Sequence, residues 1–103
     1  MRVVHITLRG RVQGVGYRAW CAHEARARGL RGWVRNRVSG AVELVAAGDE
    51  ALVAALVDAC RAGPPGARVD DLLLHDAAET ALATAGAGGS ERDRAAFVIL
   101  DTL

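Results

Sequence analysis

Apolar residues alternate with polar ones in several short stretches of the chain, and a period of two is typical of β-strands with one buried face. In residues 3–9 the apolar positions are Val4, Ile6 and Leu8, and residues 41–47 show the same alternation. Further strands are expected where apolar residues cluster between turn signals. The five expected strands span residues 3–9, 30–37, 41–47, 68–75 and 97–100.

Two stretches between these strands have the character of α-helices. Residues 18–28 are rich in good helix formers, and Gly29 follows as a typical C-terminal stop. A second helix begins at Asp49 and Glu50, whose charges suit the positive end of a helix dipole. It carries an apolar stripe and ends before Gly63-Pro64-Pro65. The stripe consists of Leu52, Val53, Leu56, Val57 and Cys60.

The order of these elements is β-α-β-β-α-β with one short C-terminal strand. Two interleaved β-α-β units of this kind predict an α+β fold of the ferredoxin-like split type, with two helices on one face of an antiparallel sheet. The other face is expected to be open. Residues 80–94 are low in complexity and are expected to form a loop. No interdomain linker is present, so we expect residues 1–103 to form a single domain.

Hydropathy and cysteine usage bear on the compartment. No apolar run approaches the roughly 20 residues of a membrane span, and the charged start lacks the apolar core of a signal peptide. Cys21 and Cys60 lie on predicted helix faces, where they are expected to act as small buried hydrophobic residues, and two thiols make no disulfide framework. We therefore expect a cytoplasmic location and no membrane partner.

The net charge of +1 conceals two halves of opposite sign. Residues 1–40 contain nine arginines and one acidic residue, Glu24, for a net charge of +8. Residues 41–103 contain four arginines and eleven acidic residues, for a net charge of −7. The positive half favours an anionic partner. The chain contains no lysine, which excludes a P-loop lysine, a Schiff base and a lysine nucleophile.

The strongest chemical signal is the glycine-rich loop of residues 10–17 (GRVQGVGY), between the first strand and the first helix. Gly14 and Gly16 can adopt positive φ, so consecutive N–H groups can converge on an anion beside the helix N-terminus. Arg18 follows in the first helical turn, where a cation opposes the helix dipole and a bound anion would relieve the conflict. Its planar guanidinium suits two oxygens of a phosphate or carboxylate. The pattern predicts an anion site, although glycines also serve tight turns.

Asn36 is the only asparagine of the chain and lies at the end of the second strand, next to the hairpin turn at Ser39-Gly40. Its amide can both donate and accept, so it can hold a water molecule near an electrophile, or it can serve the turn alone. The three histidines are scattered, and His23-Glu24 lacks the second histidine of a zinc helix. We therefore expect no metal ion and no other cofactor.

Residues 8–18 (LRGRVQGVGYR) and 32–48 (GWVRNRVSGAVELVAAG) closely resemble the two signature segments of the acylphosphatase family. The resemblance implies a hydrolase acting on acid anhydrides, which cleaves the carboxyl–phosphate anhydride of a small-molecule acyl phosphate and needs no cofactor. It assigns Arg18 to binding of the substrate phosphate and Asn36 to orientation of the attacking water. The implied phosphate-binding loop consists of Gln13, Gly14, Val15, Gly16 and Tyr17. Orthophosphate is the implied product and inhibitor.

The chain departs from the family pattern at a few positions. Ser39 replaces an aspartate that is frequent in the hairpin turn, and Leu100 stands where the family often has an aromatic or polar residue. These differences concern the rim of the site and the C-terminal edge. A non-catalytic module that binds phosphate or an acyl phosphate is the alternative function.

A nucleic-acid-binding protein is a further alternative, because some RNA-binding domains share this fold and the first half of the chain is basic. Those domains stack bases on aromatic residues of the central strands. Residues 3–9 and 41–47 contain no aromatic residue, and Trp33 is expected in the core or at the rim. We therefore expect no nucleic-acid partner. For a single domain of this size, a monomer is the default expectation.

Overall fold

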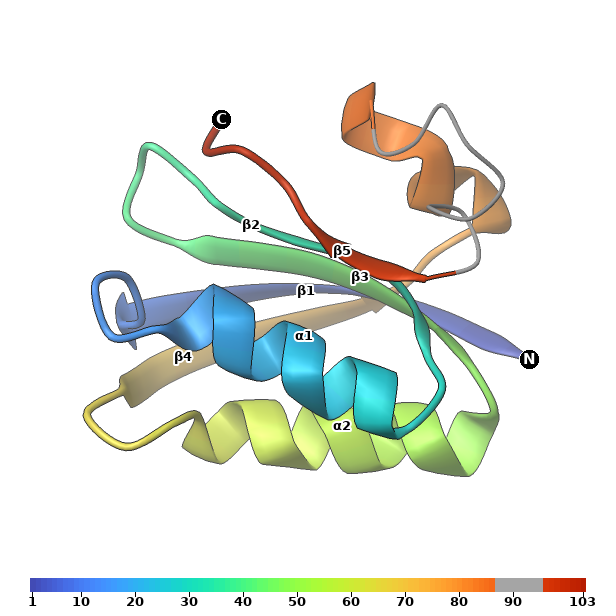
Figure 1. Cartoon of the computed structure of the whole chain (residues 1–103), viewed down its shortest axis with the longest axis horizontal. Helices are drawn as coiled ribbons and strands as arrows, with labels where there is room; N and C mark the ends of the chain where they lie inside the picture. The colour runs from blue at the N-terminus through green and yellow to red at the C-terminus, as the bar shows by residue number, and fades with distance from the viewer. Residues whose placement is uncertain (87–95) are drawn as a thin grey trace.

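Strands and helices follow one another along the chain in the predicted order (Figure 1). The computed structural model describes residues 1–86 and 96–103. The strands are β1 (Arg2–Arg11), β2 (Arg31–Asn36), β3 (Val42–Gly48), β4 (Arg68–Asp76) and β5 (Phe97–Ile99). The helices are α1 (Tyr17–Ala27), α2 (Glu50–Ala62) and the 3₁₀ helix η1 (Glu79–Gly86). The predicted strands and α-helices are thus confirmed, and η1 is additional.

The strands form one sheet in the order β4-β1-β3-β2-β5. Neighbouring strands are antiparallel except β2 and β5, which are parallel. β5 runs opposite to its predecessor β4 and reaches the far edge of the sheet, so it lies parallel to β2. Both α-helices cover the same face of the sheet (Figure 1). The ferredoxin-like fold is confirmed, with a mixed sheet in place of the expected antiparallel one.

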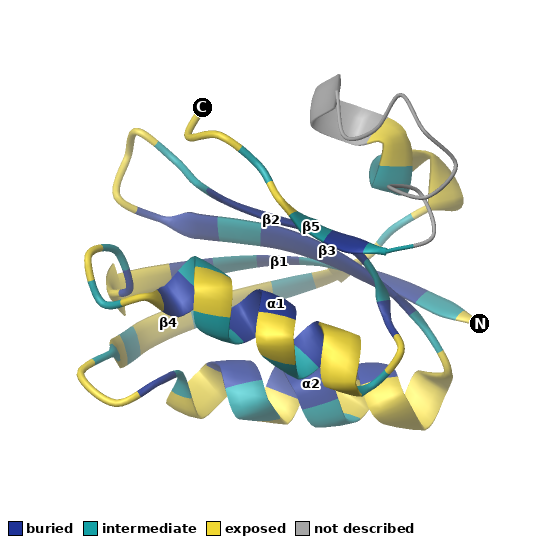
Figure 2. Ribbon diagram, viewed as in Figure 1, coloured by how far each residue is buried: buried dark blue, intermediate teal, exposed yellow. Residues whose placement is uncertain are grey.

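The main core lies between the sheet and the two α-helices (Figure 2). The alternating apolar residues of the two predicted strands are buried: Val4, Ile6 and Leu8 in β1, as predicted, and Val42, Leu44 and Ala46 in β3, where residues 41–47 were predicted to alternate. Cys21 of α1 and Cys60 of α2 are buried free thiols in this core. Their expected role as small buried hydrophobic residues is therefore confirmed.

The second α-helix begins at a capping aspartate. The Asp49 carboxylate accepts hydrogen bonds from the N–H groups of Ala51 and Leu52. Four residues of the apolar stripe of α2 are buried, namely Val53, Leu56, Val57 and Cys60, whereas Leu52 is 41% exposed. At about 100° per residue, Leu52 lies at the flank of the stripe, beyond the buried Leu56.

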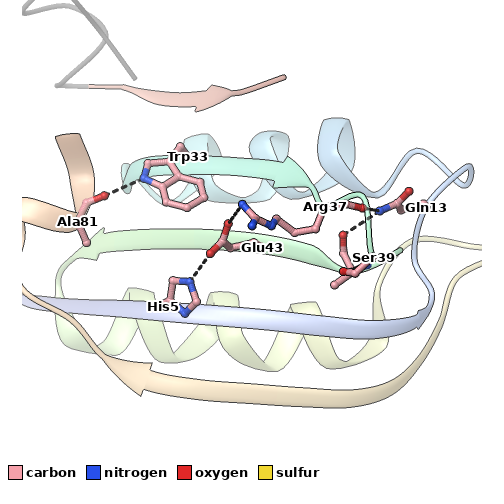
Figure 3. Close-up of polar contacts among 8 residues, drawn as sticks. His5, Gln13, Trp33, Arg37, Ser39, Glu43 and Ala81 are labelled. Carbon is pink, nitrogen blue, oxygen red and sulfur yellow. Dashed lines mark hydrogen bonds and ion pairs between the residues drawn. The ribbon is translucent and has the colours of Figure 1, made fainter. Parts of the chain in front are cut away.

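The face of the sheet away from the α-helices is partly covered by η1 (Figure 1). Trp33 of β2 is buried here, and its indole Nε1 donates a hydrogen bond to the carbonyl oxygen of Ala81 at 2.8 Å (Figure 3). This small second core consists of Val3, Trp33, Val45 and Ala47. Two expectations are therefore wrong in part. Residues 80–86 of the expected loop are helical, and the face of the sheet that was expected to be open is covered by η1 at this end. The physical reason for the cover is Trp33, because a buried indole needs both apolar neighbours and a hydrogen-bond acceptor. Residues 87–94 of the expected loop lie outside the described residues.

Farther along the same face, charged side chains form a network (Figure 3). The Glu43 carboxylate of β3 is hydrogen-bonded to His5 Nε2 at 2.7 Å and forms an ion pair with Arg37 at 3.5 Å. Arg35 is buried beside it, with its guanidinium carbon 5.2 Å from the centre of the Trp33 ring. These basic side chains are therefore held on the face opposite to the α-helices.

Candidate functional site

The glycine-rich loop leads directly into α1 and lies at the same end of the molecule as the turn between β2 and β3 (Figure 1). Gly14 and Gly16 both have a φ of 76°, a left-handed conformation that glycine adopts without strain. Gly16 is the N-cap of α1, no side-chain hydrogen bond caps this helix, and its first turn contains no acidic residue. The positive end of α1 is therefore open to an anion.

A pocket of about 270 Å³ lies between this loop, the start of α1 and the end of β2. It is lined by Val12, Gln13, Gly14, Gly16, Tyr17, Arg18, Ala19, Asn36 and Ile99. Every predicted site residue is in this lining except Val15, whose side chain packs against the main core. The fold thus brings the two sequence motifs together at one pocket.

Arg18 and Asn36 reach the pocket from different elements. Arg18 belongs to the first turn of α1, and Asn36 is the last residue of β2. Both residues are half-buried, and neither side chain forms a hydrogen bond or an ion pair with any residue that the structure describes. Their polar groups are therefore available to a ligand.

The other arginines in or beside the two motifs do not reach the pocket. Arg37 pairs with Glu43 on the opposite face of the sheet. Arg35 is buried on that same face, and Arg11 is exposed at the end of β1. In the part of the chain that the structure describes, Arg18 is the one arginine that lines the pocket.

Gln13 holds the loop against the hairpin. Its Nε2 donates hydrogen bonds to the carbonyl oxygens of Arg37 at 2.7 Å and Ala41 at 2.8 Å (Figure 3). Arg37 directly follows Asn36, so these bonds set the position of the loop relative to Asn36. Both amide hydrogens are used inside the protein, and the main-chain N–H is the donor that Gln13 can offer to an anion.

Tyr17 anchors the start of α1 to α2. Its hydroxyl donates a hydrogen bond to the carbonyl oxygen of Cys60, and its ring packs edge-on against Trp20 with the ring centroids 5.2 Å apart. Tyr17 is 1% exposed, and burial raises the pKa of its hydroxyl above the ordinary value of 10.0. The hydroxyl therefore stays protonated at neutral pH and does not serve as a proton acceptor in the pocket.

Ile99 lines the pocket although the sequence pattern did not identify it as a site residue. It reaches the pocket because β5 pairs with β2, where Ile99 lies opposite Val34. The two strands are far apart in the chain, so no local pattern could have signalled this contact.

The pocket offers hydrogen-bond donors and one guanidinium rather than metal ligands. Within residues 1–86 and 96–103, no group of three or more His, Cys, Asp or Glu side chains is placed to hold a metal ion. The described lining contains no carboxylate or imidazole side chain. Over the same residues, no helix combines the length and the apolarity needed to span a bilayer. The pocket therefore suits a small anion rich in oxygen atoms.

Fold and site together place the chain among ferredoxin-like α+β proteins with an anion-accepting pocket at a loop–helix junction. The acylphosphatase family model matches residues 4–84. An acylphosphatase of Rhodopseudomonas palustris is 51% identical over 98 residues, which cover 95% of this chain and 93% of the relative. An acylphosphatase of Azorhizobium caulinodans is 52% identical over 87 residues, which cover 84% of this chain and 87% of the relative.

Solved structures agree with these relatives. The crystal structure of acylphosphatase from Bacillus subtilis is similar with a TM-score of 0.79 and 34% identity, over 97% of this chain and 99% of that chain. The chain belongs to the acylphosphatase family, whose known activity is the hydrolysis of acyl phosphates. Its substrates are accordingly small-molecule acyl phosphates.

Proposed function

We propose that this chain hydrolyses acyl phosphates by direct attack of water at phosphorus, without a metal ion or other cofactor, and releases a carboxylate and orthophosphate. The observation that carries the proposal is the meeting of Arg18 and Asn36 in one pocket at the uncapped start of α1. Neither side chain has a partner among the described residues. We further infer that residues 1–103 form one domain.

The positive end of α1 binds the phosphoryl group. Main-chain N–H groups of the loop Gln13–Tyr17 donate to its oxygens, and the Arg18 guanidinium binds two of them. The left-handed backbone at Gly14 and Gly16 supports this role, because it allows neighbouring N–H groups to point toward one anion. The same donors stabilise the charge of a loose, metaphosphate-like transition state.

Asn36 orients the attacking water. Its amide oxygen accepts one hydrogen of the water, which turns a lone pair of the water oxygen toward phosphorus. The new O–P bond forms while the bond between phosphorus and the acyl oxygen breaks, and the electron pair of that bond leaves with the carboxylate. Because the described lining has no carboxylate or imidazole, a phosphoryl oxygen takes the proton of the water. A carboxylate is a weak base, so its departure needs little acid catalysis.

The proposal also covers the setting of the reaction. The protein acts as a cytoplasmic monomer, binds neither nucleic acid nor membranes, and is inhibited by orthophosphate, which uses the same donors as the substrate. The absence of nucleic-acid binding is supported by the central strands β1 and β3, which carry no aromatic residue. It is also supported by the ion pair that engages Arg37 with Glu43 on the face opposite to the α-helices.

Hydrolysis of benzoyl phosphate tests the assignment in the wild type, Arg18→Ala and Asn36→Ala. The loss of one such stabilising donor typically lowers kcat by about 10²–10³-fold, and Arg18→Ala is expected to lose at least that. Asn36→Ala is expected to lose turnover while calorimetry still detects orthophosphate binding. Arg9→Ala is the matched control, because Arg9 is an exposed arginine of β1 outside the pocket.

Three results would contradict the proposal. Near-wild-type hydrolysis by Arg18→Ala would refute the role of this guanidinium. Loss of activity in excess EDTA would refute a metal-independent reaction. Orthophosphate binding by the wild type without hydrolysis of benzoyl phosphate would identify a non-catalytic phosphate-binding module instead.

A further inference from the structure

The pocket has an apolar side that phosphate binding does not use. Beside its polar groups, the lining contains the apolar side chains of Val12, Ala19 and Ile99. Val12 is fully buried and forms part of the wall, whereas Ala19 is exposed and Ile99 is 43% exposed. The solvent-accessible apolar side chains of the pocket therefore belong to α1 and β5.

The pairing of β5 determines where Ile99 points. Phe97 belongs to the main core under the α-helices, and Val98 packs into the small core under η1. Since side chains alternate along a strand, Ile99 returns to the side of the sheet that carries the α-helices. Arg26 of α1 holds β5 in this place, because its Nε and Nη2 donate to the Phe97 carbonyl oxygen at 3.0 and 2.8 Å.

Ile99 differs from the other exposed apolar side chains. Among the described residues, the exposed large hydrophobic residues are Met1, Val38, Leu52, Leu73, Ile99 and Leu103. Of these, Ile99 alone lines the pocket. A ligand whose apolar group covers Ile99 removes the exposed surface of this side chain from water, and this burial favours binding of the ligand.

The pocket also has room for more than a phosphoryl group. At roughly 30 Å³ per water-sized group, a volume of 270 Å³ accommodates about nine such groups. This exceeds the number of phosphorus and oxygen atoms in a phosphoryl group, so a neighbouring part of the substrate fits as well.

We propose that Ile99 contacts the acyl group of the substrate and makes the enzyme favour large apolar acyl groups, such as aromatic ones, over acetyl. This inference rests on the proposed function, which places the phosphoryl group at Arg18 and the loop. The acyl group is bonded to a phosphoryl oxygen and extends from there along the apolar side of the pocket. A benzoyl group is large enough to cover Ile99, whereas an acetyl group covers little of it.

The test compares kcat/KM for benzoyl phosphate and acetyl phosphate in the wild type, Ile99→Ala and Ile99→Thr. Ile99→Ala is expected to lower the value for benzoyl phosphate about tenfold, because removal of methyl groups from an apolar pocket has effects of this size. The value for acetyl phosphate is expected to change by less than about twofold, on the same scale of apolar contact. Ile99→Thr keeps the β-branched shape that suits a strand, and it is expected to lower the benzoyl-to-acetyl ratio in the same direction.

Two controls separate specificity from structure. Leu73→Ala changes a side chain that is 44% exposed on β4 and lies outside the pocket, so the ratio is expected to stay at the wild-type value. The inhibition constant of orthophosphate is expected to stay unchanged in all variants, since the phosphate donors are untouched.

An unchanged ratio in both Ile99 variants overturns the inference and leaves the proposed function standing. Equal losses for both substrates with weaker inhibition by orthophosphate also overturn it, because Ile99 would then only support the shape of the pocket. A wild type that hydrolyses neither substrate refutes the proposed function itself, and the inference with it.

Discussion

Substitution of Gln13 by glutamate removes the hydrogen bonds that hold the glycine-rich loop against the β2–β3 turn. The amide donates to the carbonyl oxygens of Arg37 at 2.7 Å and Ala41 at 2.8 Å. Gln13→Glu keeps the size and shape of the side chain but replaces the NH₂ group with a carboxylate oxygen, which can only accept. The carboxylate oxygen then faces the carbonyl oxygens of Arg37 and Ala41, and all three atoms are acceptors. The glycine-rich loop is therefore expected to separate from the β2–β3 turn.

The size of the effect follows from these two bonds. Each contributes about 1 kcal/mol net to stability, so their loss destabilises the docked loop by about 2 kcal/mol, and repulsion between the carboxylate and the carbonyl oxygens adds to this. At about 1.4 kcal/mol per factor of ten, the equilibrium between docked and undocked loop shifts about 30-fold. If orthophosphate binds only the docked loop, its inhibition constant rises by up to the same factor.

The assay measures inhibition of benzoyl phosphate hydrolysis by orthophosphate, together with unfolding in urea at neutral pH. With a typical urea dependence for a chain of this size, the unfolding midpoint is expected to fall by roughly 1–2 M. Ser39→Asp is the control for charge, because it adds a carboxylate to the exposed β2–β3 turn and leaves the bonds of Gln13 in place.

Two outcomes would refute this reasoning. One is a Gln13→Glu variant with the inhibition constant and urea midpoint of the wild type, which would show that the two bonds do not position the loop. The other is a Ser39→Asp variant that weakens inhibition as strongly, which would show that added charge is the cause.

Three other changes test how the helices and strands of the fold are held in place. Burial raises the pKa of the Tyr17 hydroxyl above 10.0, so its contribution to stability is complete below about pH 10 and is lost above it, by about 1.4 kcal/mol per pH unit. Tyr17→Phe is expected to remove this alkaline loss in urea denaturation followed between about pH 9 and 11. Gly32→Ala is expected to prevent folding, as measured by circular dichroism, because φ is 142° and a Cβ would lie 1.9 Å from the Val45 carbonyl oxygen. Asp49→Ala removes the N-cap of α2 and is expected to lower the free energy of unfolding by about 1 kcal/mol, or Tm by roughly 4–8 °C, without a change in kcat/KM.

For each of these three predictions, one result would contradict the reasoning. The same alkaline slope in the wild type and Tyr17→Phe would mean that another group causes the loss of stability. A folded Gly32→Ala variant would show that β2 and β3 can move apart at this point. A lower kcat/KM in Asp49→Ala would connect the start of α2 to the pocket, which no contact among the described residues suggests.

Local patterns in the sequence were sufficient to predict the strands, the two α-helices and the glycine-rich loop. Alternation predicted which residues of β1 and β3 face the core, because successive side chains of a strand point to opposite faces. The glycine-rich loop before Arg18 was recognisable for a similar reason, since the positive φ of Gly14 and Gly16 follows from the lack of a side chain and needs no distant contact. The apolar stripe of α2 did not by itself tell which of its members are buried, because Leu52 at its flank is 41% exposed.

Charge along the chain was a weaker guide than residue identity. The excess of arginine in residues 1–40 predicted an anion site in that half, yet Arg18 is the one arginine that lines the pocket among the described residues. Arg35 and Arg37 flank Asn36 in the sequence, and for that reason their side chains lie across the sheet from it. Arg37 pairs there with Glu43 from the acidic half.

Arg18, Asn36 and the loop glycines could be selected from their chemistry and spacing, without knowledge of any contact. The folded arrangement settled three other matters: both hydrogen bonds of the Gln13 amide are made within the protein, η1 covers Trp33, and Ile99 joins the pocket. Each of these depends on segments that are distant in the chain and meet through strand pairing or through a buried group that needs a partner. Such long-range contacts depend on the packing of the whole chain, and no local pattern of residues predicts them.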